Sequence, residues 1–183
     1  MNVPYSPNLE TPRLSLAAVK ANDFSEIFDS YGADIRVAKY MTWPCTGEIR
    51  HTEMFTKSAA KIWEGEKLNP LRFDYSVRLK DGQRLIGVIG FTPDGISASI
   101  GYNFAYDSWG KGFGFEAASG LTDYLLSRPE IYRVWATHHP ENIGSGRVLE
   151  KCGFEREGYL KKQEMRPNVS NEPGDSVLWA KVK

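Results

Sequence analysis

Cysteine is scarce in this chain: only Cys45 and Cys152 occur among 183 residues, far apart and in no Cys-x-x-Cys pair. A disulfide framework or a structural zinc site needs several cysteines at short, regular spacing. Only three histidines are present in addition. The sequence therefore predicts neither a disulfide scaffold nor a metal site, and it favours a reducing compartment.

Long apolar runs and an excess of one charge are also missing. No segment approaches the roughly 18 apolar residues of a membrane helix. The first residues, MNVPYSPNLE, do not show the basic and then apolar pattern of a secretory signal. The 23 Lys and Arg residues balance 23 Asp and Glu residues, which gives no general attraction to nucleic acid. We expect a cytoplasmic protein without a membrane or nucleic-acid partner.

The length predicts one domain over residues 1–183. Hydrophobic periodicity in the first half predicts strands at 13–19, 72–79, 84–91 and 97–106, and helices at 21–32 and 48–64. The turns DGQ and PDG join the last three of these strands, which predicts an antiparallel meander. In helix 48–64 the expected buried positions are Met54, Phe55, Ile62 and Trp63. Residues 34–44 show no clear pattern.

The second half alternates helices and strands. Helices are expected at 115–127 and 142–153, and strands at 132–138, 154–160 and 175–182. Aromatic residues recur with period two in the strand that ends near Tyr106, so Tyr102 and Phe104 are expected on one face with Tyr106. The whole pattern predicts a mixed α+β fold.

Three of the 17 glycines, by contrast, stand close together in one short segment. The segment Trp109–Gly114, WGKGFG, packs three glycines around Lys111 between a predicted strand and a predicted helix. The N-terminus of a helix presents free N–H groups and the positive end of the helix dipole, which bind anions. Glycine allows positive φ and a close approach of phosphate to the backbone. The segment indicates either a pyrophosphate-binding loop or a plain glycine-rich turn.

Two common nucleotide motifs do not fit this segment. A P-loop requires GxxxxGK followed by Ser or Thr, whereas Lys111 is followed by Gly112. A dinucleotide fingerprint requires GxGxxG within a βαβ unit, whereas the glycines here are spaced GxGxG after a meander strand. A nucleotide-binding protein is therefore disfavoured.

The segment does resemble the pyrophosphate loop of the GCN5-related N-acetyltransferases (GNAT), Gln/Arg-x-x-Gly-x-Gly/Ala, with Trp109 at the first position. That substitution resembles the branch of ribosomal-protein N-terminal acetyltransferases of the RimJ/RimL type, which often has WGKG. The chain carries three further motifs of the branch: TPRLSL from Thr11, NIGSGRVLEKCGF from Asn142 with a following EG, and DSVL from Asp175. Together with the glycine segment they stand in the order that the family has, and they span nearly the whole chain.

This resemblance implies a GNAT fold, in which a mostly antiparallel central sheet is splayed in the middle and flanked by helices. It also implies acetyl-CoA as co-substrate, seated in the splay. Pantetheine would lie beside the strand edge and pyrophosphate on the backbone amides of the glycine segment. The cofactor-binding residues implied in this way are Phe104, Tyr106, Gly110, Lys111, Gly112, Phe113, Gly114 and Asn142.

Transfer of acetyl from a thioester to an amine needs a proton for the departing thiolate. Many relatives supply it from a tyrosine two positions before the lysine of K-x-G-F, and Leu149 stands there in this chain. In the RimJ/RimL-like branch the serine of N-x-x-S is the suggested substitute, which implies Ser145. Ser145 could equally be a first-turn capping residue, and Asn142 could cap the same helix.

For the general base, the resemblance implies Glu164, because a relative with the serine arrangement places a glutamate there. Asp74, His138, His139 and a water chain to solvent remain alternatives. Residues 42–45, TWPC, lie where family members shape the acceptor pocket.

The sequence thus predicts an acetyl-CoA-dependent N-acetyltransferase. The acceptor would be a primary amine, either a protein or peptide N-terminus or a small amine, which attacks directly in a ternary complex. A monomer or a homodimer is expected. The alternative is a catalytically silent acyl-CoA-binding module that senses the cofactor. That module would keep Gly112, Gly114 and Asn142 but would release no thiol.

Overall fold

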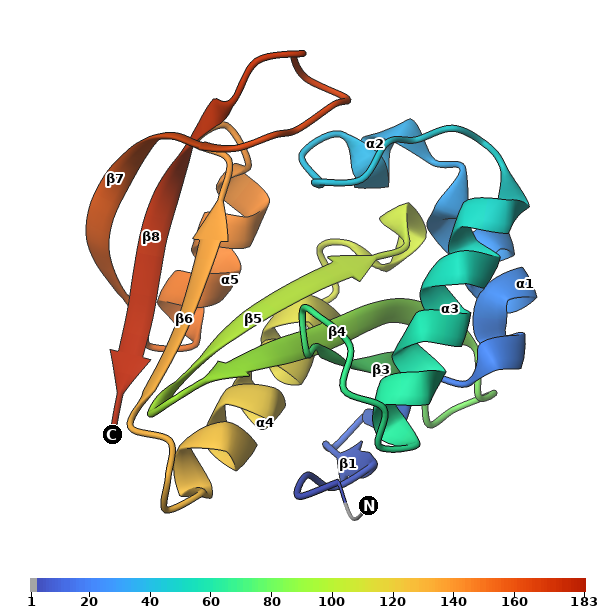
Figure 1. The fold of residues 1–183 in the computed structure, drawn as a ribbon, viewed down its shortest axis with the longest axis horizontal. Coiled ribbons are helices and arrows are strands. Elements are labelled where there is room, and N and C mark those ends of the chain that lie inside the picture. Colours follow the sequence, from blue (N-terminus) through green and yellow to red (C-terminus); the bar gives the residue numbers. More distant parts are fainter. Residues whose placement is uncertain (1–2) are drawn as a thin grey trace.

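The computed structural model describes residues 3–183, which form an eight-stranded sheet with helices on both faces (Figure 1). The strand order is β1-β2-β3-β4-β5-β6-β8-β7. Every neighbouring pair is antiparallel except β5 and β6, which are parallel. The predicted α+β fold with a mostly antiparallel sheet is confirmed.

The first half of the chain supplies five strands and the helices of one face. Its elements are β1 (Asn8–Glu10), β2 (Leu14–Ala18), η1 (Ala21–Asp23), α1 (Phe24–Ile27), the π-helical η2 (Phe28–Gly32), α2 (Ile35–Ala38), α3 (Ile49–Trp63), β3 (Phe73–Leu79), β4 (Leu85–Asp94) and β5 (Ser97–Phe104).

The second half supplies the remaining strands and the helices of the other face. Its elements are the 3-10 helix η3 (Tyr106–Ser108), α4 (Phe113–Ser127), β6 (Arg133–His138), α5 (Ile143–Lys151), β7 (Glu155–Glu164) and β8 (Gly174–Val182).

Several predicted boundaries differ from the structure: β4 and β7, for example, run on to Asp94 and Glu164. β5 ends two residues early because the chain turns at Ala105 into η3, so Tyr106 leaves the strand face and is exposed. α4 begins two residues early, at Phe113, because Gly112 adopts φ +79° and lets the chain enter the helix directly. The predicted helix 21–32 divides into η1, α1 and η2.

The buried face of α3 also differs from the prediction. Met54 is 56% exposed and Phe55 also lies at the surface, whereas Thr56, Ala59 and Ala60 are buried. Small side chains allow α3 to approach η1 closely, and the Thr56 hydroxyl donates to a backbone carbonyl of η1 at 3.0 Å. Apolar periodicity alone pointed to the larger side chains, but close helix packing selects the smaller ones.

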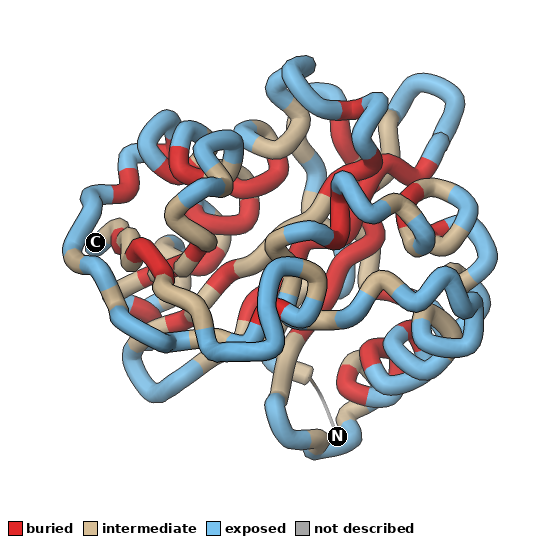
Figure 2. Tube along the Cα trace, turned by 90° about the horizontal axis from the view of Figure 1, so that it is seen from above, coloured by how far each residue is buried: buried red, intermediate tan, exposed pale blue. Residues whose placement is uncertain are grey.

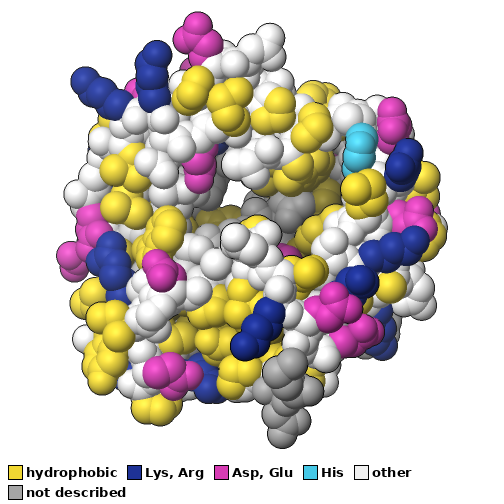
Figure 3. All heavy atoms as spheres, in the orientation of Figure 1, with side chains coloured by type: hydrophobic (Ala, Val, Ile, Leu, Met, Phe, Trp, Pro, Cys, Tyr) yellow, Lys and Arg dark blue, Asp and Glu magenta, His cyan; other side chains and the backbone are white. Residues whose placement is uncertain are grey.

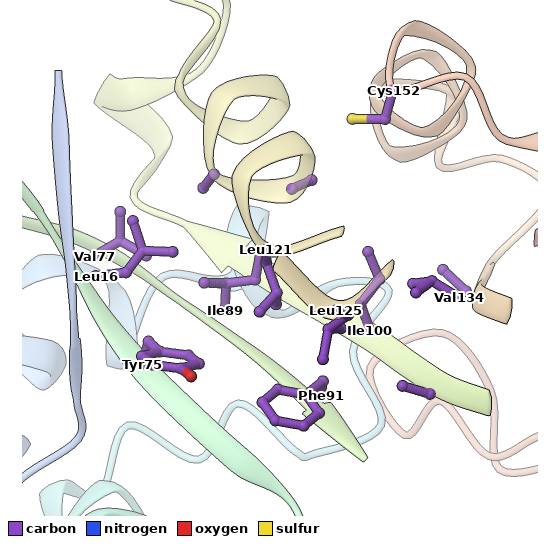
Figure 4. Close-up of a cluster of buried hydrophobic side chains, with 14 of the residues drawn as sticks. Leu16, Tyr75, Val77, Ile89, Phe91, Ile100, Leu121, Leu125, Val134 and Cys152 are labelled. Atoms are coloured by element: carbon purple, nitrogen blue, oxygen red, sulfur yellow. The ribbon is translucent and has the colours of Figure 1, made fainter. Parts of the chain in front are cut away.

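The main core lies between the sheet and α4. Side chains of β2 to β5 meet Leu121 and Leu125 of α4, and these two leucines have no exposed surface (Figure 4). Figure 2 shows buried residues along the inner strands and on the helix faces turned toward them. Each such side chain contributes roughly 1.5–3 kcal/mol on burial. α4 is therefore held firmly, and so is its N-terminus.

The sheet parts between β5 and β6. These strands pair only at Ser97 with Arg133, Ala98 with Val134 and Ser99 with Trp135. Beyond this point β5 continues along β4, while β6 continues along β8. The two strands diverge in Figure 1, and Figure 3 shows the molecule hollowed at its centre. The predicted splay is confirmed.

The far end of the gap is closed by a side chain of the β7–β8 loop. The Asn168 amide nitrogen donates to the carbonyls of Ala38 at 2.7 Å and Trp43 at 2.9 Å, and its oxygen accepts from the Cys45 N–H at 2.8 Å. Figure 1 shows this loop reaching toward the α2 region. The gap is therefore bounded at both ends, and Asn168 fixes the backbone of the TWPC segment.

Candidate functional site

The glycine segment forms the entrance to α4. Gly110 (φ +75°) and Gly112 (φ +79°) both lie in the left-handed region, which glycine adopts without strain. Gly112 is the N-cap of the 15-residue α4, and no side chain caps the helix. The first N–H groups of α4 are therefore left for water or a ligand. A Cβ on Gly110 would meet no atom within 4 Å, so the space over the loop is open.

Trp109 closes the turn before this loop. Its indole N–H donates to the Phe104 carbonyl at 2.8 Å, and its ring lies 5.0 Å from the ring of Tyr106. The Arg36 guanidinium covers the Tyr106 ring at 3.8 Å. Phe104 itself is buried, next to the site where a Cβ on Gly114 would lie. The carbonyl of Phe104 is thus already engaged within the chain.

The TPRLSL motif anchors the start of α4. The Thr11 hydroxyl and the Arg13 N–H donate to Glu116 Oε1 at 2.6 and 2.7 Å, and Arg13 Nε donates to Oε2 at 2.6 Å. Burial alone would raise the pKa of Glu116, but these hydrogen bonds and the Arg13 charge hold it below its ordinary value. The Arg13 guanidinium also bonds the Lys111 carbonyl at 3.1 Å and lies over the Phe113 ring. A second cation therefore stands beside the exposed Lys111.

Asn142 and Ser145 lie in the first turn of α5. The Asn142 carboxamide oxygen accepts from the Ser145 N–H at 3.2 Å, so Asn142 is the side chain that caps the helix. The Ser145 hydroxyl points elsewhere and lies 3.1 Å from the Tyr102 hydroxyl of β5. Tyr102 Oη is also within 3.2 Å of the Ser145 carbonyl. The two hydroxyls connect α5 to the β5 side of the gap.

Tyr102 was not predicted as a site residue. Its alternation with Ile100 and Phe104 suggested a core position. The sequence signal for a further role was that a buried tyrosine hydroxyl needs a hydrogen-bonding partner. Burial raises the pKa of Tyr102 well above its ordinary value, while its bond to Ser145 acts to lower it. Tyr102 therefore stays protonated at neutral pH.

Glu164 ends β7 and faces β6. Its Oε1 accepts from the Thr137 hydroxyl at 3.2 Å, and its Oε2 accepts from Arg166 Nη2 at 2.6 Å. Arg166 is buried and also bonds the Ser176 hydroxyl at 2.8 Å. Thr137 alternates with Ala136 and His138, which are buried on the α5 side, so Thr137 and Glu164 lie on the opposite face of the sheet from Ser145.

The structure gives the two histidines other roles. His138 Nδ1 bonds the His139 carbonyl at 2.7 Å, and its Nε2 accepts from the Trp179 indole at 2.9 Å. Burial lowers the pKa of His138, which is therefore neutral with both ring nitrogens engaged. His139 stacks on Tyr40 at 4.8 Å and its Nδ1 accepts from a backbone N–H. His138 has no free nitrogen with which to take a proton.

Asp74 is buried in β3, on the same face of the sheet as Glu164. Arg72 Nε donates to Asp74 Oδ1 at 2.9 Å, and Arg72 Nη2 donates to the Gly101 carbonyl of β5 at 3.1 Å. Burial raises the pKa of Asp74, and the Arg72 charge opposes that rise. Both carboxylates are therefore in an ion pair with an arginine, but the Asp74 side chain is 5% exposed and the Glu164 side chain 31%.

A splayed sheet with an uncapped glycine loop at the start of α4 defines a fold of acyl transferases that use coenzyme A. Residues 13–155 match the model of the acetyltransferase (GNAT) domain, and the chain belongs to this family. Within residues 3–183 no helix is long and apolar enough to cross a membrane. The same residues hold no group of three or more His, Cys, Asp or Glu side chains placed to bind a metal.

Individual relatives agree with this assignment. The uncharacterized N-acetyltransferase p20 of Bacillus licheniformis is 31% identical over 160 residues, 85% of this chain and 86% of the relative. The [ribosomal protein uS5]-alanine N-acetyltransferase of Escherichia coli is 35% identical over 104 residues, 55% of this chain and 52% of that protein. The crystal structure of a GNAT-family acetyltransferase from Bacillus anthracis superposes with a TM-score of 0.81 at 28% identity, covering 96% and 98% of the two chains.

The chain is therefore an acetyl-CoA-dependent N-acetyltransferase, as the sequence predicted. The alternative of a catalytically silent sensor has no support among these relatives.

Proposed function

We propose that the chain transfers the acetyl group of acetyl-CoA to the α-amino group of a protein or peptide N-terminus by direct attack in a ternary complex. The observation that carries this is the bounded gap between β5 and β6, with the hydroxyls of Tyr102 and Ser145 on one face and Glu164 on the other. The similarity to an enzyme that acts on a ribosomal-protein alanine supports the choice of acceptor.

The glycine loop fits the pyrophosphate of the co-substrate. Gly110 and Gly112 keep the backbone open, the first amides of α4 have no side-chain cap, and Lys111 and Arg13 add positive charge. Phe113 and Gly114 form the first turn of α4, and Asn142 holds the start of α5. Pantetheine lies along the unpaired β5 edge near Phe104 and Tyr106. When bound, the co-substrate supplies an activated thioester.

Ser145 is assigned as the proton donor to the departing thiolate. Tyr102 is its hydrogen-bonding partner, at 3.1 Å. Because Tyr102 stays protonated, its hydroxyl can hydrogen-bond to Ser145 Oγ and stabilise that oxygen while Ser145 gives up its proton, which Ser145 regains from solvent after the thiol leaves. A thiol has an ordinary pKa near 8.5, so the help needed from such a donor is modest.

Glu164 is assigned as the group that takes the proton of the amine. Thr137 and Arg166 each bind one oxygen of the carboxylate and fix its direction. Its placement on the opposite face from Ser145 separates the site of proton uptake from the site of proton release. Acetyl transfer then forms one amide bond and breaks one thioester bond, with one proton lost from the amine and one gained by the thiolate.

The test is CoA release with a panel of alanine-terminated peptides and small amines. We expect turnover with peptides, and Glu164→Gln should lower kcat by about 10²–10⁴-fold. Glu157→Gln is the matched control, since Glu157 lies on the same strand in an ion pair with Arg133 away from the gap. Tight acetyl-CoA binding without CoA release on any acceptor would contradict the proposal, and unchanged kcat in Glu164→Gln would remove that residue from it.

A further inference from the structure

Arg72 is a cation beside β5, on the face of the sheet that carries Glu164 and on which we expect the acceptor. Its guanidinium donates through Nε to Asp74 and through Nη2 to the Gly101 carbonyl. Gly101 stands two residues beyond Ser99, the last β5 residue that pairs with β6. Arg72 therefore reaches across β4 to the section of β5 that borders the gap.

Gly90 makes this reach possible, and Gly101 lies beneath the guanidinium. Asp74, Gly90 and Gly101 stand side by side on β3, β4 and β5, and all three face the same side of the sheet. A Cβ on Gly90 would lie 2.1 Å from Asp74 Oδ1 and 2.7 Å from the Phe73 carbonyl. A Cβ on Gly101 would lie 3.4 Å from Arg72 Nη2. The absence of a side chain at Gly90 leaves the space that the Asp74–Arg72 ion pair occupies.

The guanidinium keeps donors that the chain does not use. Among residues 3–183 its Nη1 makes no hydrogen bond, and Nη1 is not among the buried polar atoms without a partner, so it is open to solvent. The Arg72 side chain is 33% exposed, whereas Asp74 is only 4% exposed. The buried Asp74 carboxylate thus fixes Arg72, and the free Nη1 of Arg72 lies over Gly101 of β5.

We propose that Arg72 binds the carbonyl or carboxylate oxygen next to the amino group of the acceptor, so that acceptors are α-amino acyl compounds rather than simple amines. The assignment rests on the proposed function. A guanidinium offers a fork of donors that suits such oxygens. The same charge repels an ammonium group, which favours the neutral, reactive amine and disfavours acceptors that carry a second cation nearby. Asp74 is a positioning residue, because it acts through Arg72.

The experiment compares two acceptors that differ in one group. One is an alanine-terminated peptide, and the other is the same peptide with its first peptide bond replaced by an uncharged (E)-alkene, which lacks the carbonyl oxygen. Wild type should prefer the carbonyl-containing acceptor by about 10–100-fold in kcat/KM, the size expected for a charge-assisted hydrogen bond. Arg72→Gln should lower kcat/KM for that acceptor by a similar factor and abolish the preference. Binding of acetyl-CoA should stay unchanged.

Arg78→Gln is the control, since Arg78 lies on β3, which begins one residue after Arg72, but pairs with Glu26 away from the gap. It should keep the preference. If Arg72→Gln does not fold, Arg72→Lys serves in its place: lysine keeps the charge beside Asp74 but lacks the fork of donors, so the preference should shrink several-fold.

A wild type that uses both acceptors equally, or an Arg72 variant that loses activity on both in the same proportion, would overturn the assignment but leave the proposed function standing. No CoA release from wild type with either acceptor or with any amine would instead overturn the proposed function and the Arg72 assignment together.

Discussion

The hydroxyls of Tyr102 and Ser145 lie 3.1 Å apart, and they join β5 to α5 behind the gap in the sheet. The hydrogen bond between these two hydroxyls leads to a first prediction. Ser145→Ala and Tyr102→Phe should each lower kcat and kcat/KM together, by about 100-fold or less, because a thiolate leaves readily. In the double variant the loss should be no larger than in Ser145→Ala alone, because the two hydroxyls act as one unit.

The measurement is a double-mutant cycle of kcat with melting temperatures on the same preparations. Asn142, not Ser145, caps α5, so the alanine variant should melt close to wild type. A destabilised Ser145→Ala protein with full turnover would exclude Ser145 from the chemistry.

Acetyl-CoA should stabilise the protein through the glycine loop. At 100 times its dissociation constant it adds about 2.7 kcal/mol, or roughly 5–11 °C for a domain of this size. Gly112→Val should weaken this shift strongly, because a β-branched residue resists φ +79° and its Cβ would point toward Arg13 at 3.4 Å. Gly82→Val, in a surface turn at φ +74°, controls for the strain alone. A Gly112 variant that folds and binds normally would place the pyrophosphate elsewhere.

Glu116 should make stability depend on pH. Its pKa is lowered in the folded state, so its contribution is present above its unfolded value near 4.5 and is lost as the pH falls through the folded value. Glu116→Gln should cost about 2 kcal/mol at pH 7, and the difference from wild type should shrink in acid. Glu53→Gln, in an exposed pair with Lys57, should cost less than about 0.5 kcal/mol. A Glu116 deficit that is constant from pH 7 to pH 3 would contradict this account.

Asn168→Ala should loosen the backbone around Trp43 and Cys45. Hydrogen exchange in residues 38–45 should quicken, and KM for the acceptor should rise while acetyl-CoA affinity holds. The reason is that three hydrogen bonds from one side chain fix this segment beside the gap. Asn171→Ala, at an exposed position of the same loop, should change neither quantity. Unchanged exchange in Asn168→Ala would show that the segment is held by other contacts.

The sequence predicted the meander and the glycine loop, because period-two alternation and glycine spacing are local signals, whereas the splay was implied by the resemblance to the GNAT family. It did not place Met54, whose outward position depends on how closely α3 packs on η1. It also did not reveal the bond between Tyr102 and Ser145 or the reach of Arg72 to Gly101, since each joins residues 29 or more positions apart. Such contacts depend on the order of the strands in the sheet and on the space left by Gly90. Neither property can be predicted from a short sequence motif.

The parted sheet has a consequence for association between molecules. A strand edge with unpaired N–H and C=O groups is a template on which another chain can add a strand and aggregate. The free edges of β5 and β6 face each other inside one molecule, closed at one end by three residue pairs and at the other by Asn168. A folded neighbour cannot lay a strand there, whereas a slender ligand with amide groups can enter. The fold thus keeps unpaired backbone N–H and C=O groups at its centre, where they can bind a ligand but cannot add strands from neighbouring molecules.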